Sequence, residues 1–161
     1  MCTGPEIATT FAELGVTHVV WLPDSALGDW EAALAQSGAF RLVRVCREGE
    51  AWAIAAGLHI GGSRPIVVIQ NTGLFESGDA LRNVLFDLGL PLYAIVGYRG
   101  YLIPHSTDTA RRFTEPVLRA WGLDHVLLDQ PAKSAAKLAE HYRACQAAGK
   151  AGVALLAEGK G

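Results

Sequence analysis

The fold is decided by the stretch Pro65-Ile66-Val67-Val68-Ile69-Gln70-Asn71-Thr72-Gly73-Leu74. Its apolar run from Ile66 to Ile69 is continuous, which is typical of a strand buried on both faces in a parallel sheet. Polar residues follow at once, where open parallel sheets bind their ligands, beyond the carboxyl ends of the strands. The stretch therefore predicts both a buried central strand and a place for chemistry at its end.

Similar apolar runs alternate with helical patterns along the rest of the chain. Strands are predicted at residues 18–22, 40–45, 65–70, 92–97, 125–128 and 152–156, with the alternating second run nearer an edge or an interface. Helices are expected from about Pro5 to just before Gly15, from Asp24 or Ser25 to Gly38, and at residues 48–60, 77–88, 115–121 and 131–148. Strands separated by helices pair in parallel through right-handed crossovers. We therefore expect one α/β domain over residues 1–161, a three-layer α/β/α sandwich with a six-stranded, mainly parallel sheet.

Composition narrows the classes of function. Of the 161 residues, 50% are hydrophobic and 19% are charged, which excludes a disordered chain. The 14 basic and 16 acidic residues nearly balance and form no basic stripe, so nucleic acid is not an expected partner. No apolar run approaches the roughly 20 residues of a membrane helix, and the first residues lack signal-peptide features. We expect a cytoplasmic, soluble protein that binds neither nucleic acid nor membrane.

Two kinds of site are not predicted. Cys2, Cys46 and Cys145 are odd in number and far apart, so they indicate neither a disulfide framework nor a metal motif. The histidines show no metal-ligand spacing, and we predict no metal site. The glycine patterns GxGxxG and GxxxxGK(S/T), which cradle phosphates, are also missing from the sequence. The long segment 98–112, in contrast, indicates function, because most loops are shorter.

Four short motifs stand at the predicted strand ends in a fixed order. They are Leu22-Pro23-Asp24-Ser25, Arg47-Glu48-Gly49-Glu50-Ala51 running into Ala55-Ala56-Gly57, Gln70-Asn71-Thr72-Gly73-Leu74, and Gly97-Tyr98-Arg99-Gly100. Together they resemble the pyrimidine-binding (PYR) domain of thiamine-diphosphate enzymes, over nearly the whole chain. Within that superfamily the resemblance is to phosphonopyruvate decarboxylase and to the α subunit of sulfopyruvate decarboxylase. It implies the thiamine-diphosphate-binding fold of the PYR type.

The resemblance implies a cofactor-activating role for Glu48. In the family, a glutamate nine residues before the glycine of an Ala-rich helix hydrogen-bonds N1′ of the aminopyrimidine, and Glu48 stands nine residues before Gly57. A carboxyl group there favours the imino tautomer, whose N4′ can remove the thiazolium C2 proton. The resulting ylid attacks a 2-oxo acid, and the cofactor accepts the electrons left by departing CO₂. The structural alternative is a carboxylate that only stabilises the start of a helix.

The resemblance implies further roles at the other motifs. Asp24 and His105 would manage protons on the carbanion or enamine that remains after CO₂ loss, and Ser25 and Arg99 would contact the substrate. Three alternatives stay open: Asp24 as a helix N-cap, His105 as a surface-loop residue and Arg99 as a salt-bridge residue at a subunit contact. The cofactor pyrimidine would lie against Asn71, Thr72 and Gly73.

Two departures from the family pattern matter. After the third motif the family has Gly-Asn, whereas this chain has Phe75-Glu76-Ser77-Gly78-Asp79. Glu76 and Asp79 thus bring negative charge near the region associated with an anionic substrate tail. The chain also lacks the GDG followed by Asn that binds Mg²⁺ and diphosphate in the PP domain. Both would be held by a PP-domain (β) partner carrying GDG…Asn, in a heteromer built on α₂β₂ units.

These observations predict the PYR-domain subunit of a two-chain, thiamine-diphosphate-dependent decarboxylase (a carboxy-lyase) that acts on a small 2-oxo acid and needs Mg²⁺. One alternative keeps the cofactor but joins the enamine to an aldehyde or a second oxo acid, as acyloin- and acetolactate-forming carboligases do. Another is a non-catalytic, flavodoxin-like regulatory domain that shares the fold. Measurement of the products, and a neighbouring gene for a PP-type chain, would separate these readings.

Overall fold

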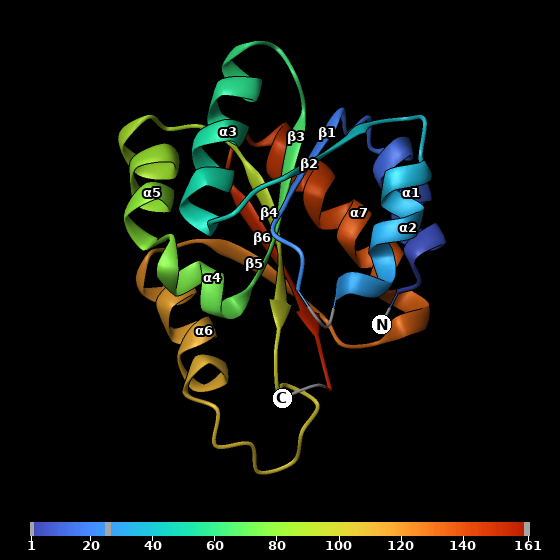
Figure 1. Cartoon of the computed structure of the whole chain (residues 1–161). Coiled ribbons are helices and arrows are strands. Elements are labelled where there is room, and N and C mark those ends of the chain that lie inside the picture. The colour runs from blue at the N-terminus through green and yellow to red at the C-terminus, as the bar shows by residue number, and fades with distance from the viewer. Residues whose placement is uncertain (1, 25–26, 160–161) are drawn as a thin grey trace.

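A six-stranded sheet forms the centre of the molecule (Figure 1). It is seen in a computed structural model of the chain, which describes residues 2–24 and 27–159. The strand order is β2-β1-β3-β4-β6-β5, and every pair is parallel. This confirms the predicted α/β fold, with a sheet that is wholly rather than mainly parallel. The strands are β1 (His18–Trp21), β2 (Arg41–Arg44), β3 (Pro65–Gln70), β4 (Tyr93–Tyr98), β5 (Asp124–Leu128) and β6 (Gly152–Ala157).

Burial along each strand follows its sequence pattern. The central strands β3, β4 and β6 are continuously apolar, and all their residues are buried except Gln70 at the end of β3. The outer strands β2 and β5 keep exposed or half-buried positions. The alternating pattern of the second run therefore predicts its edge position correctly, because only an edge strand leaves one side open to water.

Helices cover both faces of the sheet and complete three layers (Figure 1). One apolar core lies between the sheet and α1 (Gly4–Glu13), α2 (Glu31–Gln36) and α7 (Pro131–Ala147), joined by the short 3₁₀ helix η1 (Leu27–Trp30). The other core lies under α3 (Glu48–Ile60), α4 (Asn71–Glu76), α5 (Gly78–Arg82), η2 (Asn83–Asp87) and α6 (Thr109–Ala120). None of these described helices is long and apolar enough to cross a membrane.

Several helices differ from those expected. The helix expected up to Gly38 is divided into η1 and α2, which ends at Gln36, and the helix expected at 77–88 is divided into α5 and η2. Two further changes lie at the carboxyl edge of the sheet. Helix α6 begins at Thr109 instead of Glu115, because the Asp108 carboxylate accepts a hydrogen bond from the Ala110 N–H (2.9 Å) and caps the helix there. The polar stretch after β3, expected as a loop, forms the short helix α4. Both changes shorten the free backbone at the carboxyl edge of the sheet.

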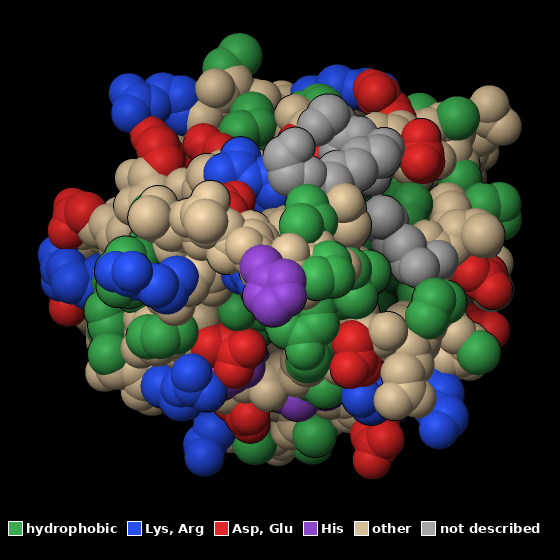
Figure 2. All heavy atoms as spheres, turned by 90° about the horizontal axis from the view of Figure 1, so that it is seen from below, with side chains coloured by type: hydrophobic (Ala, Val, Ile, Leu, Met, Phe, Trp, Pro, Cys, Tyr) green, Lys and Arg blue, Asp and Glu red, His purple; other side chains and the backbone are tan. Residues whose placement is uncertain are grey.

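The carboxyl ends of the strands meet at one edge of the molecule, the lower edge in Figure 1. Helices α3 and α4 begin at this edge, and the segment between β4 and α6 extends beyond it. Figure 2 looks onto this edge and shows acidic, basic and hydrophobic side chains interspersed. The sequence motifs that resemble the PYR domain are therefore brought together by the parallel topology.

Candidate active site

Glu48 and Gly73 lie against each other and bring two of the motifs into contact. Glu48 is the first residue of α3 and is half-buried, while Gly73 is buried in α4. A Cβ added to Gly73 would lie 2.5 Å from Glu48 Oε1 and 2.7 Å from its Cδ, closer than real side-chain carbons approach other atoms. The missing side chain of Gly73 thus provides the space that the Glu48 carboxylate occupies.

Glu76 ties α4 to the first turn of α3. Its carboxylate forms an ion pair with Arg47, with Nε 3.1 Å from Oε1, and accepts a hydrogen bond from the Gly49 N–H (3.1 Å). The pKa of Glu76 is lowered, chiefly by the Arg47 hydrogen bond and next by the Gly49 N–H. A carboxylate at a helix N-terminus is also stabilised by the helix dipole. Glu76 therefore binds both neighbours of Glu48, Arg47 and Gly49, and holds the start of α3 against α4.

A second, buried link joins the same two helices one turn further along. The Trp52 indole N–H donates a hydrogen bond to Ser77 Oγ (3.0 Å), and the Ser77 hydroxyl donates to the Gly73 carbonyl (2.6 Å). Trp52 and Ser77 are almost fully buried. Because residues four apart share a helix face, Trp52 and Glu48 face α4 together. The backbone of Gly73 is fixed relative to Glu48 by this pair.

The two glutamates in the first turn of α3 have different surroundings. Glu50 is exposed, and its carboxylate accepts a hydrogen bond from the Cys46 N–H (3.0 Å), so it supports the start of the helix. Glu48 is half-buried against Gly73, and among the described residues its carboxylate accepts no hydrogen bond. Glu48 therefore has acceptor capacity left for a molecule bound at the edge.

Asn71 and Thr72 lie beside Gly73 but are engaged differently. Asn71 is fully buried, and its amide donates to Thr114 Oγ1 of α6 (3.2 Å), while its Oδ1 has no hydrogen-bond partner within the described segments. Thr72 is half-buried and donates its hydroxyl hydrogen to Gln70 Oε1 (2.9 Å). Asn71 thus faces α6, and Thr72 remains at the strand end.

Arg99 is paired with a carboxylate of its own chain. Its Nε lies 2.8 Å from Asp108 Oδ2, and its Nη1 donates a longer hydrogen bond to Gln70 Oε1 (3.4 Å). The pKa of Asp108 is lowered, chiefly by the hydrogen bond from Arg99. Asp108 also caps α6, so this pair anchors the end of the segment between β4 and α6. The arrangement matches the salt-bridge alternative for Arg99, here within one chain.

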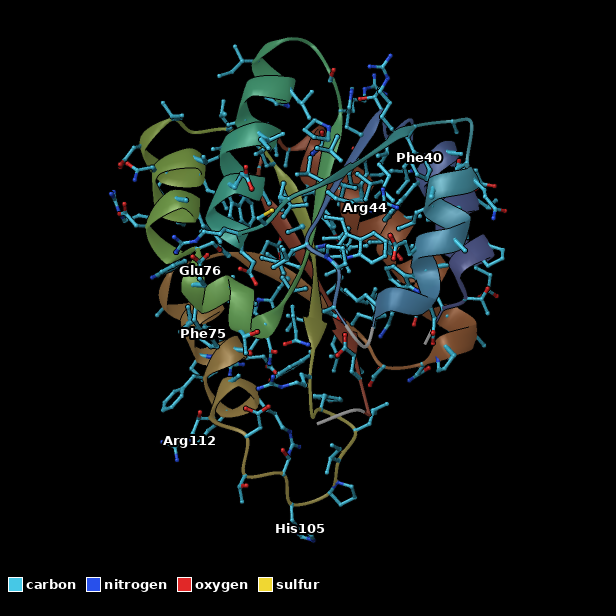
Figure 3. All side chains as sticks on the ribbon, in the orientation of Figure 1. Phe40, Arg44, Phe75, Glu76, His105 and Arg112 are labelled. Atoms are coloured by element: carbon cyan, nitrogen blue, oxygen red, sulfur yellow. The ribbon has the colours of Figure 1, made fainter. Side chains whose placement is uncertain are left out.

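The two residues expected to handle protons, Asp24 and His105, lie in different surroundings. The Asp24 carboxylate accepts a hydrogen bond from the Leu27 N–H (2.8 Å) and so caps η1, as the alternative interpretation expects. His105 is exposed at the tip of the segment after β4, has a positive φ of 57°, and points away from the molecule (Figure 3). In this conformation His105 does not reach the strand ends. Ser25, assigned to the substrate, lies outside the described residues.

Sequence reasoning missed Glu158. It follows β6, is fully buried, and packs against the backbone of Gly97 in β4, where an added Cβ would lie 3.1 Å from its Cδ. The pKa of Arg99 is raised chiefly by its hydrogen bond with Asp108. The negative charges of Glu158 and Asp24 raise it further by smaller amounts. The signal for it was present, because an acidic residue directly after a buried apolar strand stands at the carboxyl edge.

Comparison with solved structures identifies the fold as that of a domain within a decarboxylase. Benzoylformate decarboxylase from Polynucleobacter necessarius superimposes with a TM-score of 0.71 and 21% sequence identity. The match covers 98% of this chain and 30% of that one, so the chain corresponds to one part of a larger protein. At this level of identity the likeness concerns the fold alone.

Sequence comparison then gives the particular relatives. The phosphonopyruvate decarboxylases of Streptomyces viridochromogenes and Streptomyces hygroscopicus are each 32% identical over 100 residues, which is 62% of this chain and 25% of theirs. Sulfopyruvate decarboxylase subunit alpha of Methanothermobacter thermautotrophicus is 36% identical over 58 residues, 36% of this chain and 35% of that subunit. No family model matches the chain. The matched regions span a quarter to a third of these relatives, which are the homologues that the motifs predict.

Proposed function

We propose that this chain is the PYR-domain subunit of a two-chain, thiamine-diphosphate-dependent 2-oxo acid decarboxylase. The observation that carries the proposal is the half-buried Glu48 carboxylate seated on Gly73 where the motifs converge. A two-chain arrangement is supported by a relative whose name designates it as subunit alpha.

The residues at the edge fit an aminopyrimidine. Glu48 has acceptor capacity for the proton at N1′, and Gly73 makes room for its carboxylate. The ring would also meet Thr72, with the buried Asn71 behind it. When bound, thiamine diphosphate supplies the nucleophilic carbon and the electron sink for CO₂ loss. In this proposal Glu48 holds the proton at N1′ that sets the tautomer.

The diphosphate and Mg²⁺ are assigned to a partner. The resemblance implies that a PP domain with GDG followed by Asn binds both groups, and we propose that a β subunit carries it, since one relative is named as subunit alpha. The active site would lie between unlike chains of an α₂β₂ unit. Of the two residues proposed to handle protons, Asp24 follows the end of β1 by three residues, whereas His105 would reach the strand ends only if the segment between β4 and α6 folded inward.

The experiment is co-expression with a PP-type chain, followed by a screen of 2-oxo acids for CO₂ release. Glu48→Gln should lower turnover by roughly 10²-fold or more, the usual range for lost proton transfer, and should slow C2–H/D exchange of bound cofactor in parallel. Glu50→Gln is the matched control, because its amide oxygen can still accept from the Cys46 N–H. Equal activity of both variants would refute the assignment. Acyloin products in place of an aldehyde would favour the carboligase alternative.

A further inference from the structure

Three potential metal ligands converge at the amino edge of the sheet, opposite the candidate active site. Asp124 is the first residue of β5, and His141 and Cys145 lie four residues apart on one face of α7. One ligand atom from each lies within 4.8 Å of the other two. His141 Nε2 is 3.4 Å from Asp124 Oδ1 and 3.8 Å from Cys145 Sγ. The histidine nitrogen thus stands between a carboxylate and a thiol.

The two separations from His141 Nε2 are close to the ligand spacing around a tetrahedral ion, and the ligand atoms of Asp124 and Cys145 lie within 4.8 Å of each other. With Zn²⁺ bonds of about 2.0–2.3 Å, neighbouring ligand atoms of a tetrahedral site lie roughly 3.3–3.7 Å apart. The two separations from His141 Nε2 are already within about 0.1 Å of that range. Cys, His and Asp side chains are the ligands that Zn²⁺ prefers, whereas Mg²⁺ prefers oxygen atoms alone.

Surrounding groups orient the histidine. Tyr93 Oη lies 2.6 Å from His141 Nδ1, and the two rings meet edge to face with their centroids 5.6 Å apart. The Tyr93 oxygen can accept a hydrogen bond from an Nδ1–H. With the proton on Nδ1, Nε2 presents its lone pair to an ion, as in other metal sites with a hydrogen-bonded second nitrogen.

The thiol is fixed, and the carboxylate is reachable from solvent. Cys145 is 3% exposed, and a Cβ added to Gly152 would lie 2.5 Å from its Sγ, so the sulfur rests directly on the backbone. The Asp124 side chain is 66% exposed. An ion can therefore enter from the Asp124 side and keep a water molecule as its fourth ligand.

We propose that Asp124, His141 and Cys145 bind a Zn²⁺ ion that fastens the edge strand β5 to α7. On binding, the Cys145 thiol releases its proton to solvent, and one thiolate and one carboxylate balance the two positive charges of the ion. Nothing in this site takes part in the proposed decarboxylation. Its contribution is to stability, because a ligand that binds only the folded state shifts the unfolding equilibrium.

The test is titration of the untagged, reduced chain with Zn²⁺ and with Co²⁺ as a spectroscopic probe. We expect a one-to-one complex, visible bands of four-coordinate Co²⁺ with a thiolate charge-transfer band, and a melting temperature that rises with Zn²⁺ but not with Mg²⁺. Asp124→Asn, at an exposed position that should not disturb folding, should weaken Zn²⁺ binding by about tenfold or more, and Cys145→Ser should remove the charge-transfer band.

The matched control is Cys46→Ser, which removes an exposed thiol at the start of α3 and should leave binding unchanged. The proposal is overturned if Asp124→Asn binds Zn²⁺ as tightly as the unaltered chain, or if the charge-transfer band follows Cys46 instead of Cys145. Stabilisation of equal size by Mg²⁺ would also overturn it, because these ligands discriminate against that ion.

Discussion

Replacement of Gly73 by alanine tests whether the position of Glu48 matters for activity. The new methyl group would lie 2.5 Å from Glu48 Oε1 and 2.7 Å from Cδ, so one of the two groups has to move. The backbone of Gly73 is held by Ser77, whereas the Glu48 carboxylate accepts no hydrogen bond from the described residues. We therefore expect the carboxylate to move and the helix to stay.

The expected cost falls on turnover far more than on stability. Alanine inside a helix is favoured over glycine by about 0.8–1 kcal/mol, which offsets part of the cost of turning the Glu48 side chain. The free energy of unfolding of Gly73→Ala should therefore stay within about 1 kcal/mol of the original. A displacement of about 1 Å in a positioned catalytic group can cost 10²-fold in rate. Turnover of the reconstituted enzyme should fall by about that factor.

Gly57→Ala provides the control for the same chemical change. Gly57 is exposed on α3, and an added Cβ would have no atom within 4 Å, so this variant should gain about 0.5–1 kcal/mol and keep full turnover. A double-mutant cycle completes the test, because Glu48→Gln should cost little more once Gly73→Ala is present. If Glu48→Gln lowers the turnover of Gly73→Ala by its full factor, or if Gly73→Ala keeps full turnover, the reasoning fails.

Two other variants test the supports of the site. Ser77→Ala should lower the free energy of unfolding by about 1–3 kcal/mol in urea titrations, because it leaves the buried Trp52 N–H without an acceptor; an unchanged midpoint would contradict this. Asp108→Ala should cost about 1 kcal/mol at neutral pH from loss of the α6 cap. Since Arg99 lowers the Asp108 pKa, the deficit should be complete above the ordinary carboxyl pKa and should shrink as the pH falls through the lowered pKa. Urea titrations in acid and at neutral pH measure this trend, and a deficit that grows in acid would refute it.

The strands were predictable because each depends on a local pattern. A continuous apolar run such as 65–69 has no polar face to turn toward water, so it is favoured as a strand covered on both faces. It is found buried at the centre of the sheet. The start of α6 was not predicted, because it depends on competing local signals. Pro116 is typical of a first helical turn, yet it lies inside α6, whose true cap is Asp108.

The candidate site was also predictable only in part. Motif spacing predicts which residues reach the carboxyl edge, but it cannot show which way each side chain turns there. Asn71 faces α6 and His105 faces solvent, and both orientations follow from packing between segments distant in the sequence. The cluster at the amino edge is of this kind as well, because Asp124 meets Cys145 only once β5 and α7 pack together.

The acidic departures from the family motif acquire a structural explanation. Glu76 is paired with Arg47, whereas Asp79 (2.9 Å) and Asp87 (2.7 Å) share Arg82, so the charge of Glu76 is balanced and that of Asp79 is balanced in part. Charges compensated this way have little effect beyond about 10 Å at physiological ionic strength. Glu76 therefore acts mainly by joining α4 to α3, which keeps Gly73 against Glu48. Glu76 is thus part of the support for the proposed cofactor-activating carboxylate, and it does not argue against an anionic substrate.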